Sequence, residues 1–253
     1  MDLVIIALAA LLTSWLTLIS GFGLGTLLLP VFALFFELEV AIALTAVVHV
    51  LNNMFKFGLL GRWVDRKTVL WFGVPGILGA FFGVRLLQGL SALEPWFAND
   101  SITVDPLQSV IGLLMIFFAL TELYPNLKSF RFERRYLAVG GVLSGFFGGL
   151  SGHQGALRSM FLIKAGLSKE GYIATGVAIA LLVDFTRIPM YLTKMPSNLM
   201  SDNWLPVVLA TGSAFVGAVV GKRMMKKITL RSVQILVGVM MIGIGFGLIL
   251  GLI

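Results

Sequence analysis

The sequence has no cysteine, only two histidines and few charged residues. Of its 253 residues, 12% are charged and 58% are hydrophobic, and the mean hydropathy is +0.98. Because cysteine is absent, disulfides and thiolate metal sites are excluded, and the scarcity of other titratable ligands disfavours a metal transporter. The phosphate-binding pattern G-x-x-x-x-G-K-S/T is also absent, so nothing indicates ATP-driven transport. We expect neither a metal nor another cofactor.

The abundance of apolar residues predicts the fold class. A water-soluble domain of this size cannot bury so much apolar surface, so the sequence indicates an all-α polytopic membrane protein whose main partner is the lipid bilayer. The net charge of +7 would suggest a nucleic-acid partner in a soluble protein. In a membrane protein the same excess is typical of cytoplasmic loops, so we expect no nucleic acid.

The positions of the basic residues predict the topology. Fourteen of the nineteen lysines and arginines lie within four segments, 62–67, 128–135, 164–169 and 222–231. The positive-inside rule assigns all four segments to the cytoplasm. This works only if residues 138–164 enter and leave the membrane on the same face, as a re-entrant hairpin of two short helices. Residues 3–36 form the counterpart hairpin, and both termini are then periplasmic.

An internal repeat supports this topology. Gly25 and Gly155 are separated by 130 positions, as are Thr45 and Thr175, and segment 79–85 matches segment 217–223. We expect two inverted repeats, each with a re-entrant broken helical hairpin and three transmembrane helices, as in many secondary transporters. The first repeat covers residues 1–124 and the second covers residues 137–253. Residues 125–136 form a cytoplasmic connecting loop within one membrane domain.

The stretch 143–162, L-S-G-F-F-G-G-L-S-G-H-Q-G-A-L-R-S-M-F-L, is the main candidate site. Polar side chains within a membrane segment are costly, so they indicate function by default. His153, Gln154 and Arg158 follow the glycine break, where the start of a half-helix offers free N–H groups to an anion. The predicted anion site includes backbone from both breaks: Gly21, Gly23 and Gly25, and Gly152 and Gly155. Close helix packing is the alternative explanation for Gly145, Gly149 and Gly155.

A second group of polar residues lies at helical spacing in the apolar run 40–60: Thr45, His49, Asn52, Asn53 and Lys56. This stripe predicts one wall of an anion path, and a polar seam between two helices is the alternative. His49 and His153 are candidate proton carriers because histidine titrates near neutral pH. Asp184 and Arg187 are three residues apart and should form an intrahelical ion pair. The pair is either structural or, if it breaks during transport, a gating or coupling element.

Two short motifs resemble those of rhomboid intramembrane serine proteases. Residues 149–152 read G-L-S-G, and residues 49–53 read H-V-L-N-N. A serine nucleophile needs a base within hydrogen-bond reach. Rhomboids take this base from a later helix, and this sequence has no histidine after His153. The protease interpretation is therefore disfavoured, and we expect no enzymatic activity.

Residues 19–30, I-S-G-F-G-L-G-T-L-L-L-P, and their second-half counterpart resemble the duplicated G-x-G-G-G-x-x-x-x-P signature of the TauE/SafE, or TSUP, family of membrane transporters. The resemblance covers essentially the whole chain. By position, the signature falls on Gly21, Gly23, Gly25 and Pro30, and then on Gly152 and Gly155. The sequence departs from the signature at Leu24, inside the first glycine run, and at Met160, which takes the place of Pro30.

This resemblance implies a secondary transporter of a sulfur-containing anion in the bacterial inner membrane. The expected substrates are sulfite, sulfoacetate or another organosulfonate, and transport is expected to be coupled to an ion or a proton. The alternative is a passive anion channel that uses the same anion site. The sequence leaves open the direction of transport and the formation of a homodimer.

Overall fold

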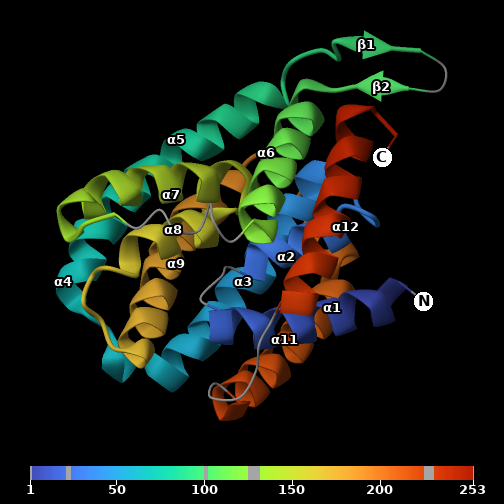
Figure 1. The fold of residues 1–253 in the computed structure, drawn as a ribbon. Coiled ribbons are helices and arrows are strands. Elements are labelled where there is room, and N and C mark those ends of the chain that lie inside the picture. The colour runs from blue at the N-terminus through green and yellow to red at the C-terminus, as the bar shows by residue number, and fades with distance from the viewer. Residues whose placement is uncertain (1, 21–23, 100–101, 125–131, 225–230, 253) are drawn as a thin grey trace.

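The computed structural model describes residues 2–20, 24–99, 102–124, 132–224 and 231–252, and most of them are helical (Figure 1). The elements before residue 125 are α1 (Asp2–Ser20), α2 (Leu24–Phe32), α3 (Leu38–Leu60), η1 (Gly61–Trp63), α4 (Arg66–Thr68), η2 (Val69–Gly73), α5 (Val74–Leu90), β1 (Phe97–Ala98), β2 (Thr103–Val104) and α6 (Pro106–Leu123). Those after residue 131 are η4 (Arg134–Tyr136), α7 (Leu137–Ser151), α8 (Gln154–Leu162), α9 (Lys169–Leu192), α10 (Leu199–Asp202), α11 (Trp204–Met224) and α12 (Arg231–Ile249).

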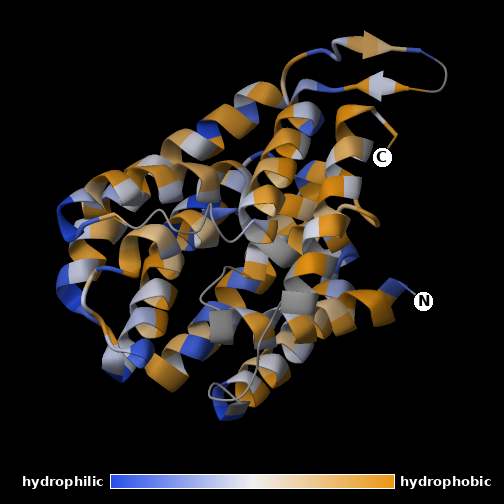
Figure 2. Ribbon diagram, viewed as in Figure 1, coloured by the Kyte–Doolittle hydropathy of each residue, from blue (hydrophilic) through white to orange (hydrophobic). Residues whose placement is uncertain are grey.

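Four helical stretches in the described residues are long and apolar enough to cross a membrane: Leu38–Trp63, Arg66–Leu90, Lys169–Leu192 and Trp204–Arg223. Three shorter apolar helices accompany them within Asp2–Thr17, Pro106–Thr121 and Gly238–Ile249. Hydrophobic residues occupy most of the length of these helices (Figure 2). The helix lengths and compositions therefore confirm the prediction of an all-helical polytopic membrane protein.

Local sequence signals explain where several helices begin. Asp105 accepts hydrogen bonds from the backbone N–H groups of Leu107 and Gln108 and so caps α6, which has Pro106 as its first residue. Ser168 caps α9 in the same way by accepting from the N–H of Gly171. Such caps satisfy N–H groups that have no partner inside the helix.

The helices pack in pairs that are distant in the sequence. Helix α5 lies along α7, α1 along α11, α6 along α12 and α3 along α9 (Figure 1). The shorter helices α2 and α8 also contact one another. Helix α3 lies near the centre, where its side chains share one large apolar core with those of α2, α6 and α12.

Glycines bring the paired backbones into direct contact. A Cβ atom at Gly79 of α5 would overlap the carbonyl oxygen of Val142, and one at Gly145 of α7 would overlap that of Gly76. Gly149 meets the carbonyl of Ala80 in the same way. Small residues at four-residue spacing allow such close approach in membrane helices. Close packing, the alternative explanation, therefore accounts for Gly145 and Gly149.

Two features were not predicted from the sequence. A π-helical segment, η2, precedes α5, and a two-stranded antiparallel hairpin joins α5 to α6 with Phe97 opposite Val104. Neither feature has a strong signal in an apolar sequence. A π-helical segment keeps the same hydrophobic composition as the helix around it, and the strands have only two residues each.

The close contact between α5 and α7 predicts different effects for alanine substitutions at two glycines of α5. Gly79→Ala should lower the stability by about 1–3 kcal/mol, because its methyl group must push two backbones apart. Gly89→Ala is the matched control, since a Cβ there meets nothing within 4 Å. Alanine is the better helix former, so the control should be neutral or stabilised by up to about 1 kcal/mol. Thermal unfolding in detergent measures both, and equal melting temperatures would contradict the packing account.

Candidate functional site

The break between α7 and α8 lies next to the start of α2. Helix α7 ends at Ser151 and is followed by Gly152, whose φ of 81° belongs to the left-handed region that favours glycine. On the other side, a Cβ atom at Gly25 of α2 would lie 3.2 Å from the carbonyl oxygen of Gly152. The two glycine-containing segments singled out in the sequence thus come together. Gly21 and Gly23 lie outside the described residues.

The residues that begin α8 are buried and only partly hydrogen-bonded. His153 is fully buried, its ring stacks on Phe118 with centroids 5.2 Å apart, and its Nδ1 lies 2.9 Å from the Ser151 hydroxyl. Among the described residues, His153 Nε2 and the amide nitrogen of Gln154 have no hydrogen-bond partner. Gly155 is buried in the first turn. Buried polar atoms without partners are rare in proteins, so these two nitrogens are available to bind a polar group.

Arg158 follows one turn later and is 5% exposed. Its Nη1 donates only a long hydrogen bond, 3.4 Å, to the side-chain oxygen of Gln154. The absence of a side chain at Gly176 of α9 makes room for the guanidinium, since a Cβ there would lie 3.4 Å from Nε. No carboxylate lies within ion-pair distance of Arg158 in the described part of the chain. Arg158 is therefore a buried cation whose hydrogen-bond partner in the described part of the chain is neutral, and the charge of Asp184 acts on it only from beyond ion-pair distance.

Lys56 of α3 is a second buried cation of this kind. It is 3% exposed, and its Nζ donates to Thr17 Oγ1 of α1 at 2.9 Å. The amide of Asn52 is best oriented with its oxygen toward Lys56, at 3.0 Å, and its nitrogen toward the carbonyl of Ala214. Both groups that hold Lys56 are uncharged. The charges of Lys56 and Arg158 lie close enough to repel one another.

The polar stripe of α3 divides into two faces. Asn52 and Lys56 face α1, where Thr17 and Ser14 contact them. His49 and Asn53 face α9 and contact Asp184. Residues three apart on a helix differ by about 60° in direction, so one stripe can serve two neighbours. Thr45, the first member of the stripe, is buried, and its hydroxyl has no partner among the described residues.

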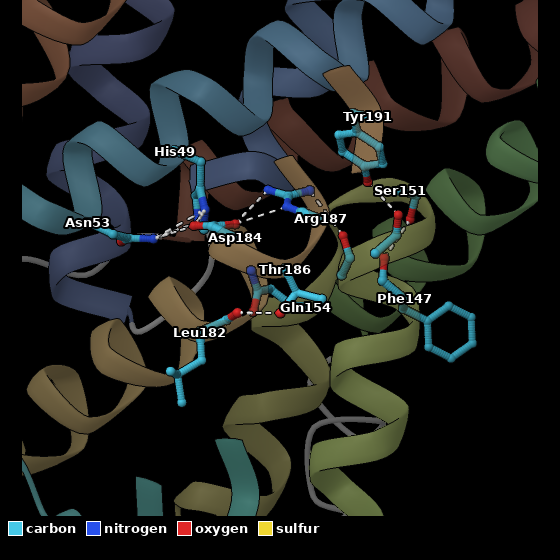
Figure 3. A network of polar contacts seen from close by, with 12 residues as sticks. His49, Asn53, Phe147, Ser151, Gln154, Leu182, Asp184, Thr186, Arg187 and Tyr191 are labelled. Atoms are coloured by element: carbon cyan, nitrogen blue, oxygen red, sulfur yellow. Dashed lines mark hydrogen bonds and ion pairs between the residues drawn. The ribbon is translucent and has the colours of Figure 1, made fainter. Parts of the chain in front are cut away.

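Asp184 is the centre of a compact ionic network (Figure 3). Its Oδ2 lies 2.7 Å from His49 Nδ1 and accepts from Asn53 Nδ2 at 3.3 Å, while its Oδ1 accepts from Arg187 Nε at 2.9 Å. The expected ion pair between Asp184 and Arg187 is thus present, and His49 joins it. His49 therefore contacts a carboxylate of α9, and its place in an anion path stays a prediction.

Arg187 and Tyr191 also donate hydrogen bonds to backbone carbonyls in the last turn of α7. Arg187 Nη1 donates to the carbonyl of Gly148 at 3.0 Å, and the Tyr191 hydroxyl donates to the carbonyl of Gly149. The last carbonyls of a helix lack partners inside it, and a cation there complements the helix dipole. Sequence reasoning missed Tyr191, Ser14 and Thr17. Their only signal is a hydroxyl in an apolar run, which many structural residues share.

The described residues offer no obvious place for a metal ion. Nowhere in the described segments do three histidine, aspartate or glutamate side chains converge. Ser151 and His153 do touch, but the Ser151 hydroxyl donates to the carbonyl of Phe147, and His49 contacts Asp184 instead of this pair. The chemistry that this arrangement fits is the binding of an anion by Arg158, Lys56 and the start of α8.

The ionic network predicts strong coupling between Asp184 and Arg187. Asp184→Asn should lower the stability by roughly 3–5 kcal/mol, because it leaves a buried guanidinium without its counter-charge. The double variant Asp184→Asn/Arg187→Gln should be less destabilised than the sum of the single variants, with a coupling energy above about 1 kcal/mol. Chemical unfolding in mixed micelles measures the free energies of unfolding of the wild type, the two single variants and the double variant. Additive effects would mean that the pair does not act as a unit.

The comparisons with known proteins agree with the resemblance noted in the sequence. No curated protein matches the chain. The sequence model of the family described as "Sulfite exporter TauE/SafE" matches residues 6–248, which is nearly the whole chain. This is a family of membrane transporters and not of enzymes, so the rhomboid interpretation is excluded. The chain belongs to the TauE/SafE sulfite exporter family.

Proposed function

We propose that the protein is a secondary transporter of a sulfur-containing oxyanion, such as sulfite, sulfoacetate or another organosulfonate, in the bacterial inner membrane. One observation carries this proposal. Lys56 and Arg158 are buried cations with no carboxylate partner among the described residues, and Arg158 lies one turn from the break between α7 and α8. Unpaired charge in a membrane interior is expensive, so such charges persist where a ligand supplies the counter-charge.

The start of α8 supplies the remaining donors for this anion. The first backbone N–H groups of a helix lack internal partners and lie at the positive end of its dipole. Here they lie next to Gln154, whose amide nitrogen has no partner among the described residues, and to the guanidinium of Arg158. A guanidinium fork matches two oxygens of a sulfite or sulfonate group. Gly25 contacts Gly152 and closes the site from the side of α2.

We propose further that the two halves of the chain are inverted repeats, with residues 1–124 and 137–253 related by a pseudo-twofold axis. The helix pairs support this, because α5 packs on α7 as α11 packs on α1. Gly79 meets Val142 and Phe146, while Gly217 meets Leu11 and Trp15, and each of these partners lies 131 positions from its counterpart. Gly112 and Gly245 each face the other's carbonyl, as expected of residues near such an axis.

In this arrangement α1–α2 and α7–α8 are the re-entrant hairpins. Helices α2 and α8 have nine residues each, a length of about 14 Å at 1.5 Å per residue, which is half of the hydrocarbon core. Their first turns, at Gly25 and at residues 154–155, then lie near the midplane. The termini are periplasmic, and the basic segment 125–136 is the cytoplasmic connection between the halves.

Of the two candidate proton carriers, His153 is assigned to proton coupling and His49 to gating. His153 Nδ1 contacts Ser151 while Nε2 has no partner among the described residues, so Nε2 can take up a proton as the anion enters. His49 and Arg187 share Asp184 and form the proposed gating element, which changes partners during the cycle.

The first prediction from this proposal compares two buried arginines. Arg158→Met should remove anion binding but leave the melting temperature of the ligand-free protein unchanged or raised, because it removes an uncompensated charge. Arg187→Met is the matched control and should lower that temperature, because it breaks a formed ion pair. Lys56→Met should behave like Arg158→Met.

The readout is thermal stabilisation by sulfite, sulfate, thiosulfate, sulfoacetate, taurine, acetate and phosphate. A ligand at one hundred times its Kd stabilises the native state by about 2.7 kcal/mol, or roughly 5–10 °C for a chain of this size. At least one sulfur oxyanion should produce such a shift in the wild type. An undiminished shift in Arg158→Met would remove Arg158 from the site.

The second prediction concerns coupling and is measured in proteoliposomes with an imposed proton gradient. His153→Asn retains a donor near the Ser151 hydroxyl and removes the titratable Nε2, so anion flux should persist but lose its dependence on the gradient. His49→Asn should reduce flux and keep the dependence. Flux through the wild-type protein that ignores the gradient would indicate the passive channel instead.

A further inference from the structure

A groove of about 830 Å³ opens on the outer side of the α3–α9 pair. Its walls come from the last turns of α3, from η2 and from α9. The residues that line its apolar part include Met54, Phe57, Leu70, Leu181, Leu182 and Phe185. Arg62 and Arg66 lie at the end formed by η1 and α4. The groove is thus apolar along its length and basic at one end.

The apolar walls are open to the surroundings of the protein. Leu70 is 63% exposed and Phe185 is 57% exposed, and Met54 and Phe57 are also exposed. Both α3 and α9 belong to stretches long and apolar enough to cross a membrane, so these side chains face the hydrocarbon core. A concave apolar surface in that position accommodates lipid chains, because contact of the same apolar side chains with water is unfavourable.

The basic end carries two guanidinium groups that are free to bind an anion. Among the described residues, neither Arg62 nor Arg66 forms an ion pair with a carboxylate. Arg62 instead lies over the ring of Trp63, at 3.9 Å from its centroid. Asp65, the acid between them in sequence, accepts a hydrogen bond from the N–H of Thr68 and caps α4, and its interactions with the side chain and backbone of Thr68 lower the pKa of its carboxyl group.

We propose that this groove binds a phospholipid with an anionic headgroup. The phosphate lies between Arg62 and Arg66, where two guanidinium forks match its oxygens. An acyl chain follows the groove past Leu70 and Phe185 toward the middle of the bilayer. The inference does not depend on the proposed substrate, because these residues are separate from Lys56 and Arg158.

The position of the groove gives the bound lipid a structural role. Leu181 and Leu182 line it, while Asp184, which lies on a neighbouring face of the same helix, contacts His49 of α3. A lipid held there packs against both helices of the pair that carries the ionic network. It therefore stabilises the α3–α9 pair from the membrane side.

Native mass spectrometry of the detergent-purified protein tests this site. The probes are phosphatidylglycerol and phosphatidylcholine with identical acyl chains, and inorganic phosphate as a separate addition. Wild-type protein should retain phosphatidylglycerol in preference to phosphatidylcholine. Arg62→Gln/Arg66→Gln should reduce this preference roughly tenfold or more. The control Arg85→Gln/Lys194→Gln removes two other exposed basic residues and should retain it.

Three outcomes would overturn the proposal. Equal retention of the two lipids by the wild type would show that the arginines do not select a headgroup. An equal loss of preference in both double variants would assign the effect to net charge. Displacement of phosphatidylglycerol by millimolar inorganic phosphate would identify a phosphate site in which the groove plays no part. A melting temperature for Arg62→Gln/Arg66→Gln equal to that of the wild type in detergent without lipid confirms that the variant is folded.

Discussion

The structure depends above all on how positive charge is held inside a membrane protein. A cation removed from water needs a counter-charge or a set of oriented dipoles. Arg187 has both, because Asp184 lies 2.9 Å away and the carbonyl of Gly148 accepts a hydrogen bond from it. Lys56 and Arg158 have only neutral partners among the described residues. The first cation fixes the helices, and the other two define the proposed binding site.

Helix α9 contributes both to the ionic network and to the proposed binding site. Helix α9 provides Asp184 and Arg187 to the ionic network, and its Gly176 leaves room for the guanidinium of Arg158. Arg187 and Tyr191 bind the final carbonyls of α7, so the chain can turn at Gly152 and begin α8 inside the protein. Because polar backbone is tolerated at membrane depth only where protein or a wet cavity covers it, this support is a condition for an anion site at the break.

The sequence predicted the helical membrane class, the positions of the two short helices around the break, and the pairing of Asp184 with Arg187. Each has a local signal: hydropathy, a glycine cluster or helical spacing. The division of the α3 stripe between α1 and α9 was not predictable, since it depends on which helices lie on either side of α3. The same limit applies to Thr17 and Tyr191, whose partners are 39 and 42 residues away in sequence. A single sequence carries no record of such contacts.

The central claim is that Lys56 and Arg158 bind the transported anion. The most direct measurement is anomalous X-ray diffraction from crystals grown with selenite, the heavier analogue of sulfite. The account predicts a selenium peak within hydrogen-bond distance of the Arg158 guanidinium, near the start of α8 and within a few ångströms of Lys56. A selenium peak at another site, with no selenium density beside Arg158 or Lys56, would contradict the account.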